Sequence, residues 1–257
     1  MKNAATSSTD AALRSAIEPI NAVIAIVGDV KTAEVIEKAK KYFEAIPRQK
    51  DPDPVDMTEP APSGEKRIVM EDALARLSRV DISWVVPPSS SRDDAALSVL
   101  ATVLGGGRSS RLYENVVRQQ QLATGINAGK GESRGPGLFQ FGISVAPGKS
   151  PADAEKAAYA ELEKVKTDGV KDWEVEKARS SARRQMVNGL QSSLQRAVLL
   201  SQNALFYDDP ERINNRLKMI SDVTAADVQR VAKQYLTDNN RSVIVTTPKA
   251  AARPGDK

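Results

Sequence analysis

A proline-rich, charged segment interrupts the sequence early and limits what the residues before it can form. Residues 49–64 carry four prolines among charged and small side chains, a composition typical of an extended linker. The stretch of about fifty residues before it is too short for a comfortable hydrophobic core of its own. We therefore expect residues 1–48 to be the last strand and helix of a first module. Residues 65–248 are expected to form a complete second module, followed by a disordered tail over 249–257.

Before the linker, an apolar run is followed by an amphipathic segment. Ala22 to Val27 is a continuous β-prone run, which predicts a strand covered on both faces. Thr32 is placed to N-cap a helix with acidic residues early and lysines late, and Pro47 is expected to end it. Bare apolar elements cost stability and invite pairing. We therefore expect this strand and helix to dock on the second module or to pair between two copies of the chain.

The second module begins with strands. Short or alternating apolar segments predict strands over residues 67–70, 80–86 and 139–145, with 123–137 providing an antiparallel partner for the last of these, and a closing strand over 243–245.

Most of the remaining module is predicted to be helical. Apolar spacing and capping signals predict helices over 93–104, from Ser150-Pro151 to Gly169, from Trp173 towards Phe206, from Pro210, and after a capping box at Thr224 and Asp227. Within the first of these, Leu97, Leu100, Ala101 and Leu104 form the apolar stripe. The order of elements predicts an α+β fold, with an antiparallel or mixed β-sheet and helices packed on one face.

The sequence contains neither Cys nor His. This excludes disulfide frameworks, thiolate nucleophiles, cysteine-ligated metals, the HExxH zinc motif and Ser-His-Asp triads. Carboxylates alone can hold Mg²⁺ or Ca²⁺, but no DxDxDG loop supports such a site. We therefore expect no catalytic residue, no metal and no cofactor in this chain. The lack of Cys also favours a periplasmic or exported location over a cytoplasmic one.

Charge and hydropathy argue against two further classes of partner. The net charge is +4, but the 37 basic residues are interleaved with 33 acidic ones and aromatic residues make up only 4%. This pattern favours solvated helix faces over a nucleic-acid interface, which would show itself by salt-dependent binding. The longest apolar run, Ala22 to Val27, is far shorter than the roughly 20 residues of a membrane span. We expect no nucleic-acid partner and no membrane span.

Two motifs in this order resemble the insulinase/pitrilysin family of zinc metallopeptidases, which includes mitochondrial processing peptidase and the core proteins of respiratory complex III. Residues 21–30, NAVIAIVGDV, resemble the strand that ends the family's first module. Residues 104–113, LGGGRSSRLY, resemble a turn of its second module. The resemblance implies a two-layer, processing-peptidase-like module. It identifies the chain as the second, non-catalytic module of a bacterial-type subunit.

The resemblance places zinc in the complete family enzyme and not in this chain. Active members bind zinc through an inverted HxxEH motif and a distant Glu in the first module, and this chain has no His. The family's Arg–Tyr substrate pair is also missing. Depending on the alignment, its positions fall on Val117 and Thr124 or on Arg118 and Gly125.

The resemblance therefore implies a module that supplies chamber wall and packing surface. Its partner would be a catalytic-type module or a partner subunit of the same family, with peptide substrates in the assembled enzyme. The alternative is a structural scaffold like the complex III core proteins. An HxxEH motif encoded upstream of residue 1 would indicate the peptidase, and its absence from an otherwise full-length protein would indicate the scaffold.

The glycine-serine-arginine turn is the candidate substrate-binding or inter-module site. It comprises Gly105, Gly106, Gly107, Arg108, Ser109, Ser110, Arg111 and Tyr113. The turn lacks phosphate-loop spacing, and without His or an S-x-x-K motif neither serine is a usual nucleophile. The alternative interpretation is a helix C-cap followed by an N-cap at Ser109 or Ser110, opening a helix through Val117. In that case Arg111 would pair with a local carboxylate such as Glu114 while Tyr113 packs.

Overall fold

The computed structural model describes residues 22–47, 55–60 and 62–249. The described residues group into two compact units. The larger unit comprises residues 57–183 and 217–249, and the smaller one combines the residues before 57 with residues 184–216. The domain boundaries expected from the sequence stay predictions, and nearly all of the expected tail at 249–257 lies outside the described residues.

The larger unit is built on a five-stranded mixed sheet in the order β1-β5-β2-β4-β3. Its strands are β1 (Lys66–Asp72), β2 (Arg79–Val86), β3 (Ala123–Lys130), β4 (Gly137–Val145) and β5 (Arg241–Pro248). β1 runs parallel to β5, and the other neighbouring pairs are antiparallel. All four predicted strands of the second module are confirmed, and β3 is the predicted antiparallel partner of β4.

The alternation in β2 and β4 sends one set of side chains into the core. In β2, Val80, Ile82, Trp84 and Val86 are at most 2% exposed, whereas the residues between them are only partly buried. Trp84, Phe139 and Phe141 pack edge to face, with ring centroids 5.0–6.4 Å apart. These aromatic pairs anchor the centre of the core.

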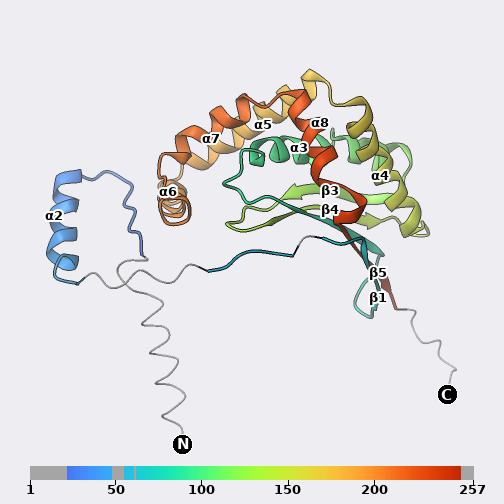
Figure 1. The fold of residues 1–257 in the computed structure, drawn as a ribbon, viewed down its shortest axis with the longest axis horizontal. Coiled ribbons are helices and arrows are strands. Elements are labelled where there is room, and N and C mark those ends of the chain that lie inside the picture. The colour runs from blue at the N-terminus through green and yellow to red at the C-terminus, as the bar shows by residue number, and fades with distance from the viewer. Residues whose placement is uncertain (1–21, 48–54, 61, 250–257) are drawn as a thin grey trace, which may run out of the picture. The chain divides into compact units, whose positions relative to one another are not determined.

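Helices cover one face of this sheet. α3 (Asp94–Gly105), α4 (Pro151–Asp168) and α8 (Ala225–Tyr235) contact its strands and lie on one side of it in Figure 1. The other described helices are α2 (Thr32–Phe43), the π-helix η1 (Tyr113–Gln119), α5 (Asp172–Leu190), α6 (Ser193–Tyr207), α7 (Arg212–Ser221) and the 3₁₀ turn η2 (Asp238–Asn240). The four stripe residues of α3 are all buried. The predicted α+β fold, with a mixed sheet and helices on one face, is confirmed.

The predicted caps of α4 and α8 are also confirmed. Ser150 accepts the backbone N–H of Asp153 ahead of the proline at N1, and Gly169 ends α4 with a φ of 76°. Thr224 and Asp227 form the reciprocal capping box of α8.

The strand predicted at Ala22 to Val27 is wrong, because these residues form no regular structure. A strand needs a neighbour to take up its backbone N–H and C=O groups, and no strand within the described ranges pairs with this run. The following helix begins with Thr32 at its first position rather than at the cap. Its N-cap is Lys31, which makes no side-chain capping bond. The helix ends at Phe43, before Pro47.

The long helix predicted from Trp173 towards Phe206 is two helices. α5 ends at Leu190 and α6 begins at Ser193. The Ser192 side chain accepts the backbone N–H of Gln195 and so caps α6. A serine that can bond to the backbone favours such a new start over a continuous helix.

Candidate functional site

The glycine turn ends α3 in close contact with the sheet. Gly106 is the C-cap, and its N–H donates to the Thr102 carbonyl. Gly105 lies directly against β3, where a Cβ would come within 1.9 Å of the Ala128 nitrogen. Gly107 adopts a φ of 100°, a conformation that favours glycine. The C-cap part of the alternative interpretation therefore matches the observed turn.

The helix after the turn differs from the prediction. It starts at Arg111, becomes a π-helix from Tyr113 to Gln119, and so extends past Val117. The Ser110 hydroxyl is buried without a hydrogen-bond partner, so this side chain does not cap the helix. Ser110 contacts the helix start through its backbone carbonyl, which accepts the Glu114 N–H. The predicted side-chain N-cap at Ser110 is wrong.

Arg111 joins three segments of the larger unit. Its guanidinium donates to both carboxylate oxygens of Glu174, at 2.7 and 2.6 Å, and to the Gly169 carbonyl at 3.1 Å. Glu174 also accepts the Lys171 N–H at the start of α5. Arg111 thus pairs with a carboxylate from α5, and Glu114 pairs with Arg118 instead.

Burial and hydrogen bonding act in opposite directions on this pair. Burial favours the neutral form of Glu174, but the bonds from Arg111 and Lys171 outweigh it and lower the pKa of the carboxyl below its usual value. The same contact raises the pKa of Arg111. The side chains are 19% and 9% exposed, so this ion pair is a largely buried tie between the turn and α5.

A cleft of about 390 Å³ lies beside the turn. Its lining residues are Ser109, Ser110, Arg111, Glu114, Asn115, Gln119, Glu161, Lys164, Lys171, Trp173 and Glu174. Three are basic and three acidic, so the lining has no net charge. Asn115 and Lys164 both donate to Glu161, each at 2.6 Å, which fixes the π-helix on α4. The volume is that of a small-molecule site or of a few peptide side chains.

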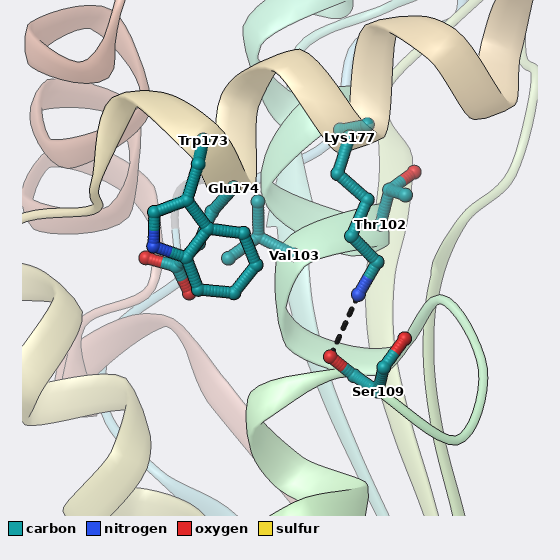
Figure 2. A pocket seen from close by; sticks show the side chains of 7 residues that line it. Thr102, Val103, Ser109, Trp173, Glu174 and Lys177 are labelled. Atoms are coloured by element: carbon teal, nitrogen blue, oxygen red, sulfur yellow. Dashed lines mark hydrogen bonds between the residues drawn. The ribbon is translucent and has the colours of Figure 1, made fainter.

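A second, smaller pocket of about 10 Å³ adjoins the cleft, enough for about one water. Figure 2 shows Lys177 reaching from α5 to the turn, where its ammonium donates to the Ser109 carbonyl at 2.7 Å. Trp173 lies beside Glu174 in the same view and is 59% exposed. The wall shared by the two cavities therefore includes an exposed aromatic ring.

The structure distributes the eight predicted site residues over three environments. Ser109, Ser110 and Arg111 line the cleft. Gly106, Gly107 and Arg108 are exposed on the turn, while Gly105 packs on β3 and Tyr113 is half-buried against the core. That these residues bind substrate or a neighbouring module stays a prediction.

Sequence reasoning did not find the walls opposite the turn. The Glu161–Lys164 pair carries a local signal, because the two are three positions apart on one helix face. Trp173 and Lys171 carry no such signal, since only the tertiary fold places them beside residues 109–119.

A serine and a lysine also meet elsewhere, at Ser89 and Lys130. The Lys130 ammonium donates to Ser89 Oγ at 3.0 Å, to the Gly131 carbonyl at 3.1 Å and to the Asp94 carboxylate. Ser89 is only 1% exposed, so its hydroxyl is not accessible to a substrate. This cluster holds the end of β3 on the start of α3.

The sequence lacks the histidine donors of the family's zinc site. The described part of the chain also has no group of three acidic side chains placed to hold a metal ion. The residues present do not fit the zinc of the complete family enzymes. None of the helices that the structure describes is long and apolar enough to cross a membrane.

Comparison with curated proteins finds zinc proteases. The chain is 27% identical over 234 residues to the zinc protease PqqE of Helicobacter pylori, covering 90% of this chain and 52% of that protein. It is 30% identical over 175 residues to a zinc protease of Mycobacterium bovis, covering 68% and 40%. The chain thus spans about half the length of the curated relatives it matches.

Solved structures share the fold. A protease from Helicobacter pylori superposes with a TM-score of 0.79 at 26% identity, covering 86% of this chain and 54% of that one. An inactive peptidase domain from Bordetella parapertussis gives 0.64 at 26% identity, covering 70% and 96%. The model of the peptidase M16 inactive domain matches residues 12–182. The resemblance to the insulinase/pitrilysin peptidases is confirmed, and the chain belongs to the family of M16 peptidase inactive domains.

Proposed function

We propose that this chain is the non-catalytic half of a zinc peptidase, supplying chamber wall and packing surface to a catalytic-type module that carries the zinc. The match to a family of inactive domains carries the proposal. It is supported by relatives named zinc proteases that are about twice as long as the matched region. In the complete enzyme, zinc would activate the attacking water, and none of the residues described above takes part in that step.

Residues 22–46 offer a surface for that neighbour. Large apolar side chains there are 41–67% exposed: Val23, Ile24, Ile26, Val30, Ile36, Tyr42, Phe43 and Ile46. No residue of α2 is buried. Covering one Val or Ile side chain contributes about 1.5–3 kcal/mol, so docking of this segment on the catalytic-type module would stabilise both partners.

Zinc analysis and peptide cleavage test the first half of the proposal. The purified chain, incubated with zinc and then dialysed, is expected to retain no stoichiometric zinc and to cleave no peptide. Chelator-sensitive cleavage with one bound zinc per chain would refute it.

Reconstitution tests the second half. A zinc-bearing M16 module from the same organism is expected to co-elute with the chain and to cleave peptides faster with it than alone. A version starting near residue 64 should bind that module more weakly. A stable complex that cleaves nothing, with its zinc site intact, would favour the alternative function, a structural scaffold. A chain of complex III from Candida albicans shares this fold, with a TM-score of 0.63 at 14% identity.

The place of action is part of the same proposal. The lack of Cys supports a periplasmic or exported protein. Fractionation of the source cells tests this, and recovery in the cytoplasm alone would refute it.

A further inference from the structure

β1, at one edge of the sheet, has an apolar centre between charged ends. Among the described strands it has β5 as its neighbour on one side and none on the other. Its central residues Ile68, Val69 and Met70 are 56%, 67% and 48% exposed. Proteins usually protect such an edge, because its unpaired backbone groups can add a strand from another chain.

The backbone groups at this edge can be assigned. The Asp72 carbonyl accepts the Lys249 N–H at 3.0 Å, which turns Asp72 towards β5. Successive residues of a strand alternate in direction, so Ile68 and Met70 also face β5. Arg67, Val69 and Glu71 then face outward, with three N–H and three C=O groups at the open edge.

The sequence of β1, KRIVMED, is complementary to itself when read in the opposite direction. An antiparallel pair centred on Val69 places Lys66 opposite Asp72 and Arg67 opposite Glu71. It also places Ile68 opposite Met70 and Val69 opposite its own copy. Directly opposite residues share a face of the sheet, so Lys66 meets Asp72 and the centre is apolar. Arg67 lies opposite Glu71, although its guanidinium already bonds Glu155 and Glu65 of its own chain.

The same register uses every outward backbone group. Val69 pairs with Val69, and Arg67 pairs with Glu71 at each end, which provides six hydrogen bonds. Sliding by two residues one way places Glu65 opposite Glu71, and sliding the other way places Asp72 opposite Ile68. The charges therefore select one alignment instead of blocking the edge.

We propose that β1 pairs with β1 of a second copy of this chain, in antiparallel register about Val69, and joins two sheets into one across a two-fold axis. A single strand pair buries less surface than the roughly 1,200 Å² of a stable interface. The dimer is therefore weak and rapidly reversible. This inference is independent of the proposed function.

Charge exchange between two variants tests the pairing. Lys66→Glu places Glu opposite Asp72, and Asp72→Lys places Lys opposite Lys66. Each variant alone is therefore expected to self-associate at least about ten-fold more weakly than the wild type. An equimolar mixture restores both charge pairs and is expected to associate as the wild type does. Sedimentation velocity from about 10 μM to about 1 mM measures this. Lys156→Glu, on the exposed face of α4, is the matched control and should leave association unchanged.

Two further measurements locate the contact. Val69→Pro removes an outward N–H without touching the bonds to β5, so it should abolish association and keep the wild-type circular dichroism. In the wild type, the amides of Arg67, Val69 and Glu71 should exchange hydrogen more slowly as concentration rises. A wild type that stays monomeric, a mixture that stays monomeric, or association that survives the charge variants would each overturn the proposal. The last result would assign the dimer to another surface, such as the exposed apolar side chains of residues 22–46.

Discussion

Replacing Gly105 by alanine is expected to destabilise the larger unit, because the last residue of α3 lies against the backbone of β3. An added Cβ would lie 1.9 Å from the Ala128 nitrogen, 2.6 Å from its Cβ and 2.7 Å from its Cα. These atoms belong to the main chain or adjoin it, so no rotamer change relieves the clash. The helix end and the strand must move apart.

Two effects of opposite sign set the size of the stability change in Gly105→Ala. Overpacking a close contact costs about 1–3 kcal/mol, and the upper value applies where backbone must move. Alanine is favoured over glycine in a helix by about 1 kcal/mol. The expected net loss is about 2 kcal/mol, or about 4–8 °C in Tm for a unit of this size.

Urea unfolding followed by circular dichroism measures this loss as a lower midpoint with an unchanged slope. Gly129→Ala is the matched control, because it lies on the same strand, next to Ala128, and its added Cβ meets no atom within 4 Å. It should stay within about 0.5 kcal/mol of the wild type. If Gly105→Ala also stays within that limit, the close approach of α3 to β3 is not what requires glycine here.

Three further predictions concern single contacts. Glu174→Gln leaves Arg111 without its carboxylate partner and should lower stability by about 2 kcal/mol at pH 7, less than the roughly 3–5 kcal/mol of a fully buried pair. The control Glu176→Gln breaks an exposed pair and should cost under about 0.5 kcal/mol. Because the pKa of Glu174 is lowered in the folded protein, its contribution to stability is present above about pH 4.5 and is lost as pH falls through the folded pKa. The stability deficit of Glu174→Gln should therefore shrink in acid, and a deficit independent of pH would contradict this. Burial, with the bond to Asp93, raises the pKa of Tyr235 to about 12, so the stability of the wild type should fall between about pH 10 and pH 12. In urea titrations over that range, Tyr235→Phe should lose less stability than the wild type. An equal loss would exclude this phenol as the cause. Thr224→Ala removes the capping box of α8 and should lower the urea midpoint by an amount equal to about 1 kcal/mol, while no change would mean that the cap is replaced by water.

The sheet and most caps could be predicted from the sequence because their signals are local. Alternation alone identified the strand with Val80 and Trp84, and the Ser150-Pro151 pair identified the start of α4. The run at Ala22 to Val27 has an equally strong β-prone composition and still forms no strand. Composition gives a preference for extended structure, but a strand also needs a neighbour.

The candidate site was only partly predictable, because tertiary contacts build it. The turn at 105–110 is visible in the sequence, but its partner Glu174 lies 63 residues beyond Arg111. The π-helix was missed, since its wider backbone hydrogen bonds leave little trace in side-chain spacing. The cleft exists only where segments near 110, 161 and 171 meet.

The position of β5 has a consequence for the order in which the larger unit assembles. β5 is the last of the described strands, yet it lies between β1 and β2 and pairs Ser242 with Lys66. During synthesis, β1 therefore has no neighbour until residues 241–248 have left the ribosome. Closing so long a loop is slow, and before it closes one edge of β2 lacks its partner. The unit thus completes its sheet only after residues 241–248 are available, and a chain shortened before Arg241 would lose two strands of the sheet instead of one.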